Sequence, residues 1–317
     1  MKYNILLYYC YTTIEDPYVF REQHHFDCLE LNLRGRIIIA PEGINGTLSG
    51  LVADTEKYML QLKSDPRFSS IDFKVETHHQ HAFQKLNVRV KPEIVHANLV
   101  NINPQERTGE YIEPKDLKKE LADPNVVLLD VRSNYEHDLG KFKDAHTLQM
   151  ENFREFPEIV KEISHLKKKK IITYCTGGIK CEKASAYLLE QGFENVYQLH
   201  GGIIKYGIEA GGEDFEGKCY VFDNRIAVDV NHVNPVVVSK CYCCGEVCDR
   251  MVNCANPECN LHMPLCRDCG ITMEGACSNE CKDNRAKRPY NGTGYYQKEL
   301  NGYNPYRGIR RGQRFDP

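Results

Sequence analysis

Residues 171–181 read IITYCTGGIKC: an apolar run, a cysteine, a glycine pair and a second cysteine. The apolar run predicts a strand that is buried on both faces. The residues from 182 to 191 have the spacing of a helix, and Gly192 is a typical helix stop. A strand, a glycine-rich turn and a helix are therefore expected to follow one another around Cys175.

Two further apolar strands, at 126–131 and 196–199, flank this segment, and a second helical pattern covers 155–166. Apolar strands that alternate with helices predict a parallel α/β sheet that is covered on both faces. We predict that this α/β domain spans residues 121–218.

Cys175 is predicted to be a catalytic nucleophile. The N–H groups of the loop and the helix dipole place partial positive charge at the sulfur and favour the thiolate over the thiol. Lys180 adds a full charge beside it. A buried structural cysteine is the alternative, although a glycine pair is a costly choice for packing alone. The residues predicted to bind an anion on the sulfur are Thr176, Gly177, Gly178 and Ile179.

The second thiol of the loop, Cys181, has two interpretations. It could resolve a persulfide on Cys175 as a disulfide, or accept its sulfur. It could equally be a small apolar residue that packs at the start of the helix.

Residues 1–92 are predicted to form an α+β domain. Their strand-like and helix-like stretches follow the order β-α-β-β-α-β of a ferredoxin-like (acylphosphatase-like) unit. We expect a turn at 41–45 and a cap at Asp54 for the second helix. Residues 93–120, which contain Pro104 and Gly109, are predicted to be a linker.

Ten of the fifteen cysteines lie between Cys241 and Cys281, so residues 219–281 are predicted to be a cysteine-rich module. Two CxxC pairs interleave with two wider pairs, which predicts two closed, structural zinc sites. The segment has few large apolar residues and could hardly fold without such a staple; reduced thiols or disulfides are the alternative. The predicted ligands are Cys241, Cys244, Cys266 and Cys269 for one ion, and Cys254, Cys259, Cys277 and Cys281 for the other.

Residues 282–317 form a basic, aromatic tail. Nine Lys and Arg against three Asp and Glu give it a net charge of +6, so the preceding 281 residues carry −9. Arginines pair with phosphates and aromatic faces stack on unpaired bases, so this tail is predicted to contact RNA; a disordered tail is the alternative. The candidate RNA-binding residues are Arg285, Lys287, Arg288, Tyr295, Tyr296, Arg307, Arg310 and Arg311.

Three separated elements resemble the rhodanese family: the loop at 175–181, LDVRSNYE at 129–136 and VYQLHGGI at 196–203. The loop is similar in length to that of the sulfurtransferases, and Cys181 stands where the related phosphatases need an arginine. The resemblance implies a persulfide on Cys175. The candidate catalytic residues are then Cys175, Lys180, Cys181 and the bracing pair Asp130 and Arg132.

The order of the parts resembles the bacterial tRNA uridine(34) hydroxylase family across nearly the whole chain. APEGINGT at 40–47, the Cys175 loop, KCYVFDNR at 218–225 and the cysteine module carry the resemblance. It implies an enzyme that hydroxylates the wobble uridine of tRNA to 5-hydroxyuridine, with molecular oxygen as co-substrate and Cys175 as the essential cysteine. Lys180 stands where the family usually has arginine, which keeps the charge and loses the planar fork.

The residues themselves predict the nucleophile and not the oxidation, because the sequence has no CxxCH haem motif, no nucleotide or flavin motif and no facial triad. One hypothesis is that the sulfur attacks C6 of uracil and makes C5 electron-rich toward an oxidant. The competing functions are a sulfurtransferase that moves sulfane sulfur from a donor to an acceptor thiol or tRNA, and a non-catalytic, zinc-stabilised RNA-binding adaptor.

No apolar run approaches the roughly 20 residues that cross a bilayer. The N-terminus lacks the small-residue cleavage site of a signal peptide. We therefore expect a cytoplasmic protein without a membrane partner, whose cysteines stay reduced.

Overall fold

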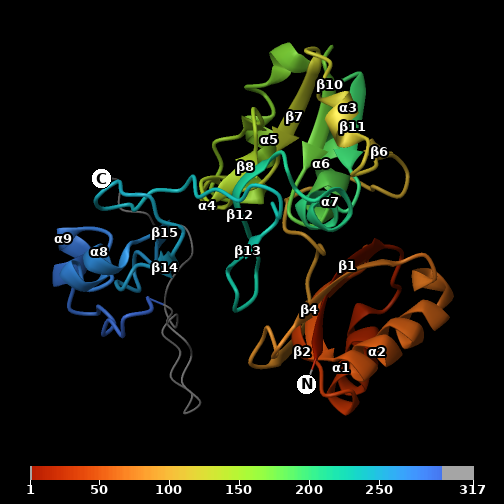
Figure 1. The fold of residues 1–317 in the computed structure, drawn as a ribbon. Helices are drawn as coiled ribbons and strands as arrows, with labels where there is room; N and C mark the ends of the chain where they lie inside the picture. The colour runs from red at the N-terminus through yellow and green to blue at the C-terminus, as the bar shows by residue number, and fades with distance from the viewer. Residues whose placement is uncertain (1, 295–317) are drawn as a thin grey trace.

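The computed structural model describes residues 2–294, which form three bodies along the chain (Figure 1). The N-terminal body packs against the second one, and the cysteine-rich body lies beside the second one near strands β12 and β13. The core of each body is built separately, so each is described in turn.

The first body confirms the predicted ferredoxin-like order. Its sheet has the order β4-β1-β3-β2-β5, in which β5 runs parallel to β2 and the other neighbours are antiparallel. The elements are β1 (Tyr3–Tyr11), α1 (Pro17–Glu30), β2 (Arg34–Ala40), β3 (Gly43–Leu51), α2 (Val52–Ser64), β4 (Asp72–His78) and β5 (Leu86–Val90).

Two local predictions for this body are wrong. The turn between β2 and β3 is shorter than 41–45, because the strands continue to Ala40 and restart at Gly43. Asp54 does not cap α2: the helix begins at Val52 without a side-chain cap, and Asp54 lies in its first turn. A carboxylate there still interacts favourably with the helix dipole.

The second body has the predicted parallel sheet, with the order β6-β11-β10-β7-β9. Alternate residues of β10 enter different cores, Ile171 on one face and Ile172 on the other, so the strand is buried on both sides as expected. The strands are β6 (Glu110–Ile112), β7 (Val126–Asp130), β9 (His146–Thr147), β10 (Lys170–Tyr174) and β11 (Asn195–Leu199).

The predicted linker contains one of these strands. β6 pairs with β11, and α3 (Leu117–Glu120) follows it. Ala97 and Leu99 are also buried in the core of the second body, so much of the predicted linker belongs to that body. Three residues are too few to show a strand period, which is why the sequence pattern missed β6.

The helical pattern at 155–166 is wrong as a single helix. The segment forms separate turns: a 3-10 turn at Phe153–Glu155, α5 (Phe156–Ile159) and a 3-10 turn at Ser164–Leu166. Its apolar residues Phe156, Val160 and Ile163 are nevertheless buried in one core, so their spacing reports the core-facing side correctly. The remaining helices are α4 (Asn134–His137), α6 (Ile179–Glu190) and α7 (Gly202–Ala210).

A small antiparallel sheet connects the second body to the third. It has the order β13-β12-β8 and consists of β8 (Gly140–Phe142), β12 (Phe215–Tyr220) and β13 (Ala227–Asp229). Cys219 and Val230 are buried in the core of the second body, so the first part of the predicted module belongs there. The third body contains β14 (Met251–Asn253), β15 (His262–Pro264), α8 (Arg267–Thr272) and α9 (Asn279–Asp283).

Candidate functional site

Cys175 lies where β10 ends and the glycine-rich turn begins. Its sulfur accepts a hydrogen bond of 3.2 Å from the N–H of Gly178. Gly178 has φ of +99°, a conformation that favours glycine, and it directs this N–H back toward the sulfur. The start of α7 holds the other side of the loop, where the Ile203 N–H donates to the Cys175 carbonyl at 3.0 Å.

The Cys175 sulfur is both buried and ionised near neutral pH. Burial raises the pKa of this thiol, but the Cys181 thiol, the Lys180 charge and the N–H groups of Lys180 and Gly178 together outweigh burial and lower the pKa to about 6. The predicted thiolate therefore has a physical basis in the folded loop.

Cys181 lies at the start of α6 with its side chain buried in the core that also contains Cys175. Burial, and then the neighbouring Cys175 charge, hold the pKa of Cys181 well above its ordinary value, so this thiol stays protonated. The Cys181 thiol is the first of the groups that lower the pKa of Cys175. This role combines with the predicted packing role.

Lys180 does not stand free beside the sulfur, because it forms an ion pair with Glu136. Its Nζ lies 2.6 Å from Glu136 Oε2, and the Glu136 side chain is fully buried. The Ser133 N–H donates to the same carboxylate oxygen at 3.1 Å, and the Thr176 hydroxyl lies 3.5 Å from the other oxygen. Glu136 is therefore part of the site, and its only signal in the sequence is the last position of LDVRSNYE.

Asp130 is the last residue of β7, and Arg132 follows it. They form a fully buried ion pair of 2.6 Å. Asp130 also accepts a bond from the Tyr174 hydroxyl at 2.5 Å, and Arg132 donates to the Gly140 carbonyl at 2.8 Å. Through the Tyr174 hydroxyl the pair joins the ends of β7 and β10, and its expected bracing role stays a prediction.

Strand β1 of the N-terminal body covers the loop. The sequence did not predict this contact between the two bodies. A methyl group on Gly177 would lie 2.7 Å from Leu7 Cδ2, and one on Gly178 would lie 2.9 Å from the Tyr9 hydroxyl. The Tyr11 hydroxyl donates to the Ile179 carbonyl at 3.5 Å. Cys175 is only 1% exposed beneath this cover.

Glu182 anchors the cover to the second body. Its carboxylate accepts bonds from the hydroxyls of Tyr9 at 2.8 Å and Tyr111 at 2.6 Å, and from Thr108 and Gln198 at 3.1 and 3.0 Å. Three segments that are far apart in the sequence thus meet on one buried carboxylate. Sequence spacing contains no signal for such a contact.

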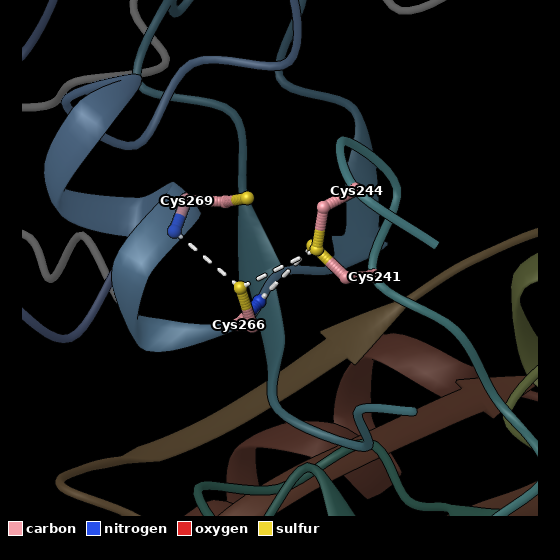
Figure 2. Close-up of side chains that lie close together, drawn as sticks. All are labelled: Cys241, Cys244, Cys266 and Cys269. Atoms are coloured by element: carbon pink, nitrogen blue, oxygen red, sulfur yellow. Dashed lines mark hydrogen bonds between the residues drawn. The ribbon is translucent and has the colours of Figure 1, made fainter. Parts of the chain in front are cut away.

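The cysteine module brings together the eight predicted ligands in the predicted partition. Within each group of four, the sulfur atoms lie within 4.8 Å of one another. Figure 2 shows the first group, in which Cys266 and Cys269 come from the start of α8 and face Cys241 and Cys244. Zinc–sulfur bonds of about 2.3 Å place tetrahedral sulfurs roughly 3.8 Å apart, and Cys244 and Cys266 are separated by 3.8 Å.

The described part of the tail is engaged inside the module. Arg288 is buried and donates to the Ala255 carbonyl at 3.0 Å, so its guanidinium does not face a bound RNA. Lys287 forms an ion pair with Glu274. Arg285 is exposed. The remaining candidates, Tyr295, Tyr296, Arg307, Arg310 and Arg311, lie outside the described residues.

Known families match three parts of the chain. A family described as "UPF0176 acylphosphatase like domain" matches residues 3–94, "Rhodanese-like domain" matches 113–209 and "Rhodanase C-terminal" matches 216–282. A tRNA uridine(34) hydroxylase of Cytophaga hutchinsonii is 64% identical over 98% of this chain and 99% of its own length. The chain belongs to the tRNA uridine(34) hydroxylase family. The resemblance expected from the sequence is thereby confirmed.

Other members of the tRNA uridine(34) hydroxylase family match over similar lengths. The protein of Bacillus cereus is 50% identical over 88% of this chain and 89% of its own, and that of Enterococcus faecalis is 48% identical over 91% and 92%. Among solved structures, a rhodanese-like domain from Anabaena sp. is 25% identical and covers 35% of this chain and 80% of that one, with a TM-score of 0.29.

Across residues 2–294, we find no helix with the length and apolar character that a membrane span requires.

Proposed function

We propose that this protein hydroxylates the wobble uridine of tRNA at C5 and that the Cys175 thiolate is its nucleophile. One observation carries the proposal: a thiol whose pKa falls to about 6 sits in the loop of a chain that is 64% identical to a protein named tRNA uridine(34) hydroxylase. A nucleophile that is ionised at neutral pH is what an addition to the uracil ring requires.

The chemistry can be written for the residues of the loop. The thiolate adds to C6 of uracil and breaks the C5–C6 double bond, so that C5 becomes a carbanion equivalent. C5 takes one oxygen atom from the oxidant and then loses its proton, and the C6–S bond breaks to release thiolate and 5-hydroxyuridine. With molecular oxygen as the oxidant, the second oxygen atom ends in water and a reductant supplies two electrons.

The loop residues have distinct roles in this scheme. The N–H of Gly178 and the Cys181 thiol stabilise the thiolate before attack and after release. Lys180 holds a positive charge at the loop and is itself held by Glu136. The β1 cover must move away from Gly177 before a nucleotide can reach the sulfur, because Cys175 is 1% exposed.

Mass spectrometry of tRNA nucleosides tests the proposal. Cells that lack the gene should lose 5-hydroxyuridine, and the wild-type protein but not Cys175→Ser should restore it. Restoration by Cys175→Ser would overturn the role of the sulfur. Rapid formation of thiocyanate from thiosulfate and cyanide, with unchanged tRNA, would favour the sulfurtransferase instead.

We also propose that the module holds two structural zinc ions. Each set of four thiolates would complete a tetrahedron and leave no open position, so the metal would stabilise the fold and take no part in the reaction. Protein purified without chelator should contain about two equivalents of zinc. Cys281→Ser should lower this to about one, and less than one equivalent in the wild type would contradict the proposal.

We place this activity in the cytoplasm. The fifteen cysteines all lie in the described chain and form no disulfide there, which suits a reducing compartment where tRNA is also found.

A further inference from the structure

A recess lies between the second body and the cysteine module. It has a volume of about 590 Å³ and is lined from one side by β12 and the turn before β13, and from the other by the segment that leads into β14. A second recess of about 410 Å³ continues from it, because both are lined by Arg250 and Arg267. We call the two together the basic groove.

The charges in this groove are predominantly positive. Its lining contains four bases, Lys218, Arg225, Arg250 and Arg267, one acid, Asp249, and Cys266, one of the proposed zinc ligands. The Arg225 charge is compensated, since its guanidinium contacts Asp223 at 2.7 Å and Glu76 at 3.1 Å. Lys218 is also paired, with Asp249 at 2.9 Å and Asp229 at 3.9 Å, so the charge that forms no ion pair comes from Arg250 and Arg267.

Arg250 supplies a fixed and uncompensated charge. Its guanidinium donates to the carbonyls of Leu265 at 2.8 Å and Cys266 at 3.0 Å, to two carbonyls at 292 and 293, and to the Tyr290 hydroxyl. All these partners are neutral, so the positive charge remains. The donors are engaged, so Arg250 creates potential in the groove and does not itself bind a ligand directly.

Arg267 and Lys218 are the groups that can reach a ligand. Arg267 is exposed, and within residues 2–294 its side chain forms no ion pair or hydrogen bond. Lys218 lies 2.9 Å from Asp249, and both side chains are about one-third exposed. Such a half-exposed pair is weak, so an incoming phosphate can compete for the lysine.

Two features point to RNA as the occupant. Tyr290 lines the groove beside the cations, an arrangement that suits phosphates and bases together. The chain also leaves the described structure at Gly294, where Asn253 of β14 donates its N–H to the Gly294 carbonyl. The residues from 295 to 317 contain five Lys and Arg against two Asp and Glu, a net charge of +3 in the sequence.

The groove also leads to the reactive cysteine along one strand. Lys218 and Tyr220 are two residues apart on β12, roughly 7 Å. The Tyr220 carbonyl accepts a bond from the Thr176 hydroxyl of the Cys175 loop at 3.4 Å. The groove thus adjoins the strand that contacts the Cys175 loop.

We infer that the basic groove binds the tRNA phosphate backbone, with Lys218 and Arg267 in contact with phosphates and Arg250 as a fixed positive charge. This inference rests on the proposed function and names the surface by which its substrate is held.

Binding of an unmodified tRNA transcript to the full-length protein tests the inference. The variants are Lys218→Ala, Arg267→Ala and their combination. The matched control is Arg107→Ala, an exposed arginine ahead of β6, which lies at the sheet edge opposite β9. Each lost phosphate contact should weaken binding roughly four- to sixfold at 0.15 M salt and reduce the slope of log affinity against log salt by about one.

Unchanged affinity and an unchanged salt slope in the double variant would overturn the inference. Equal competition by polyglutamate and by tRNA would also overturn it, because the groove would then accept any polyanion, including an acidic protein. Alkylation of Cys175 at the wild-type rate shows that the variants are folded.

The outcome is separable from that of the proposed function. If the double variant binds tRNA normally and makes normal amounts of 5-hydroxyuridine, the role of the groove is refuted and the proposed reaction stands. If the double variant loses tRNA binding but the wild-type protein makes no 5-hydroxyuridine, the role of the groove stands and the proposed reaction is refuted.

Discussion

The Cys175 sulfur experiences two opposing effects, and their balance decides whether it can react. Complete burial alone would leave a neutral and inert thiol. Three contributions oppose burial: a hydrogen bond from Cys181, the charge of Lys180 and the N–H groups of the loop. Since the pKa falls to about 6, roughly nine-tenths of the sulfur is thiolate at pH 7.

The Cys181 thiol is the neighbour whose contribution can be removed most cleanly. Cys181→Ala deletes the donor, so the pKa of Cys175 should rise and the midpoint of its pH-dependent alkylation by iodoacetamide should move upward. Cys181→Ser keeps a donor and is expected to stay near the wild-type midpoint. An alanine variant with an unshifted midpoint would contradict the donor role, and normal turnover of that variant would exclude a resolving role.

The pair of Lys180 and Glu136 should control stability as well as charge. Lys180→Met leaves the fully buried Glu136 carboxylate without its cation, so the free energy of unfolding should fall by about 3–5 kcal/mol. Lys180→Met combined with Glu136→Gln removes both charges and should recover most of the loss. Urea denaturation measures both, and equal destabilisation by the single and double variants would show that the pair is not coupled.

At the scale of elements, strand β1 serves two bodies at once. One set of its side chains, such as Leu6 and Tyr8, fills the N-terminal core, while Leu7 and Tyr9 alternate with them and cover the Cys175 loop. The period of two in a strand explains how a single segment can do both. The cover therefore depends on the register of β1 within its own sheet.

Trimming this cover should expose the sulfur. Leu7→Ala removes the side chain above Gly177, so iodoacetamide should alkylate Cys175 several times faster, while the pH midpoint stays where it is. Leu86→Ala is the matched control. Leu86 is also a partly buried leucine of the N-terminal body, but it packs against the core of that body. Equal acceleration by both variants would mean that general loosening, and not the cover, is responsible.

The sequence could predict those elements whose signal is local. The strand and turn around Cys175 and the individual cysteine pairs follow from spacing within a few residues, and the partition of the eight cysteines follows from the way these pairs interleave; both agree with the structure. The strand β6 is too short to show a period, and the turns around Phe156 are helical only in pieces. The contact of Tyr9 with Glu182 joins residues 173 positions apart, so no local pattern could indicate it.

At the scale of the whole molecule, Lys183 ties the first two bodies together. Its ammonium is fully buried on α6 and lies 2.8 Å from both Glu42, in the turn after β2, and Glu93, in the connecting segment. It also donates to the Leu99 carbonyl at 3.1 Å. The same helix begins with the reactive loop, so the position of the β1 cover depends on this cation.

Replacement of Lys183 should therefore loosen the two bodies from one another. Lys183→Met leaves two carboxylates facing each other in a buried site, so the free energy of unfolding at pH 7 should fall by about 3–5 kcal/mol, and proteases should cleave the connecting segment faster. Lys57→Met, on the exposed face of α2, should change stability by less than about 0.5 kcal/mol.

The dependence of the free energy of unfolding on pH below 7 also tests the role of Lys183. Burial raises the pKa of Glu93, but Lys183 and the N–H groups of Leu99 and Asn98 hold it below the usual 4.5. A lowered carboxyl pKa stabilises the fold above pH 4.5, and this stabilisation disappears as the pH falls through the folded pKa. In Lys183→Met the unpaired carboxyl prefers its proton. The free energy of unfolding of this variant should therefore stay constant or rise as the pH falls. A variant whose unfolding free energy falls with acid as steeply as the wild type would show that Glu93 takes its charge stabilisation from elsewhere.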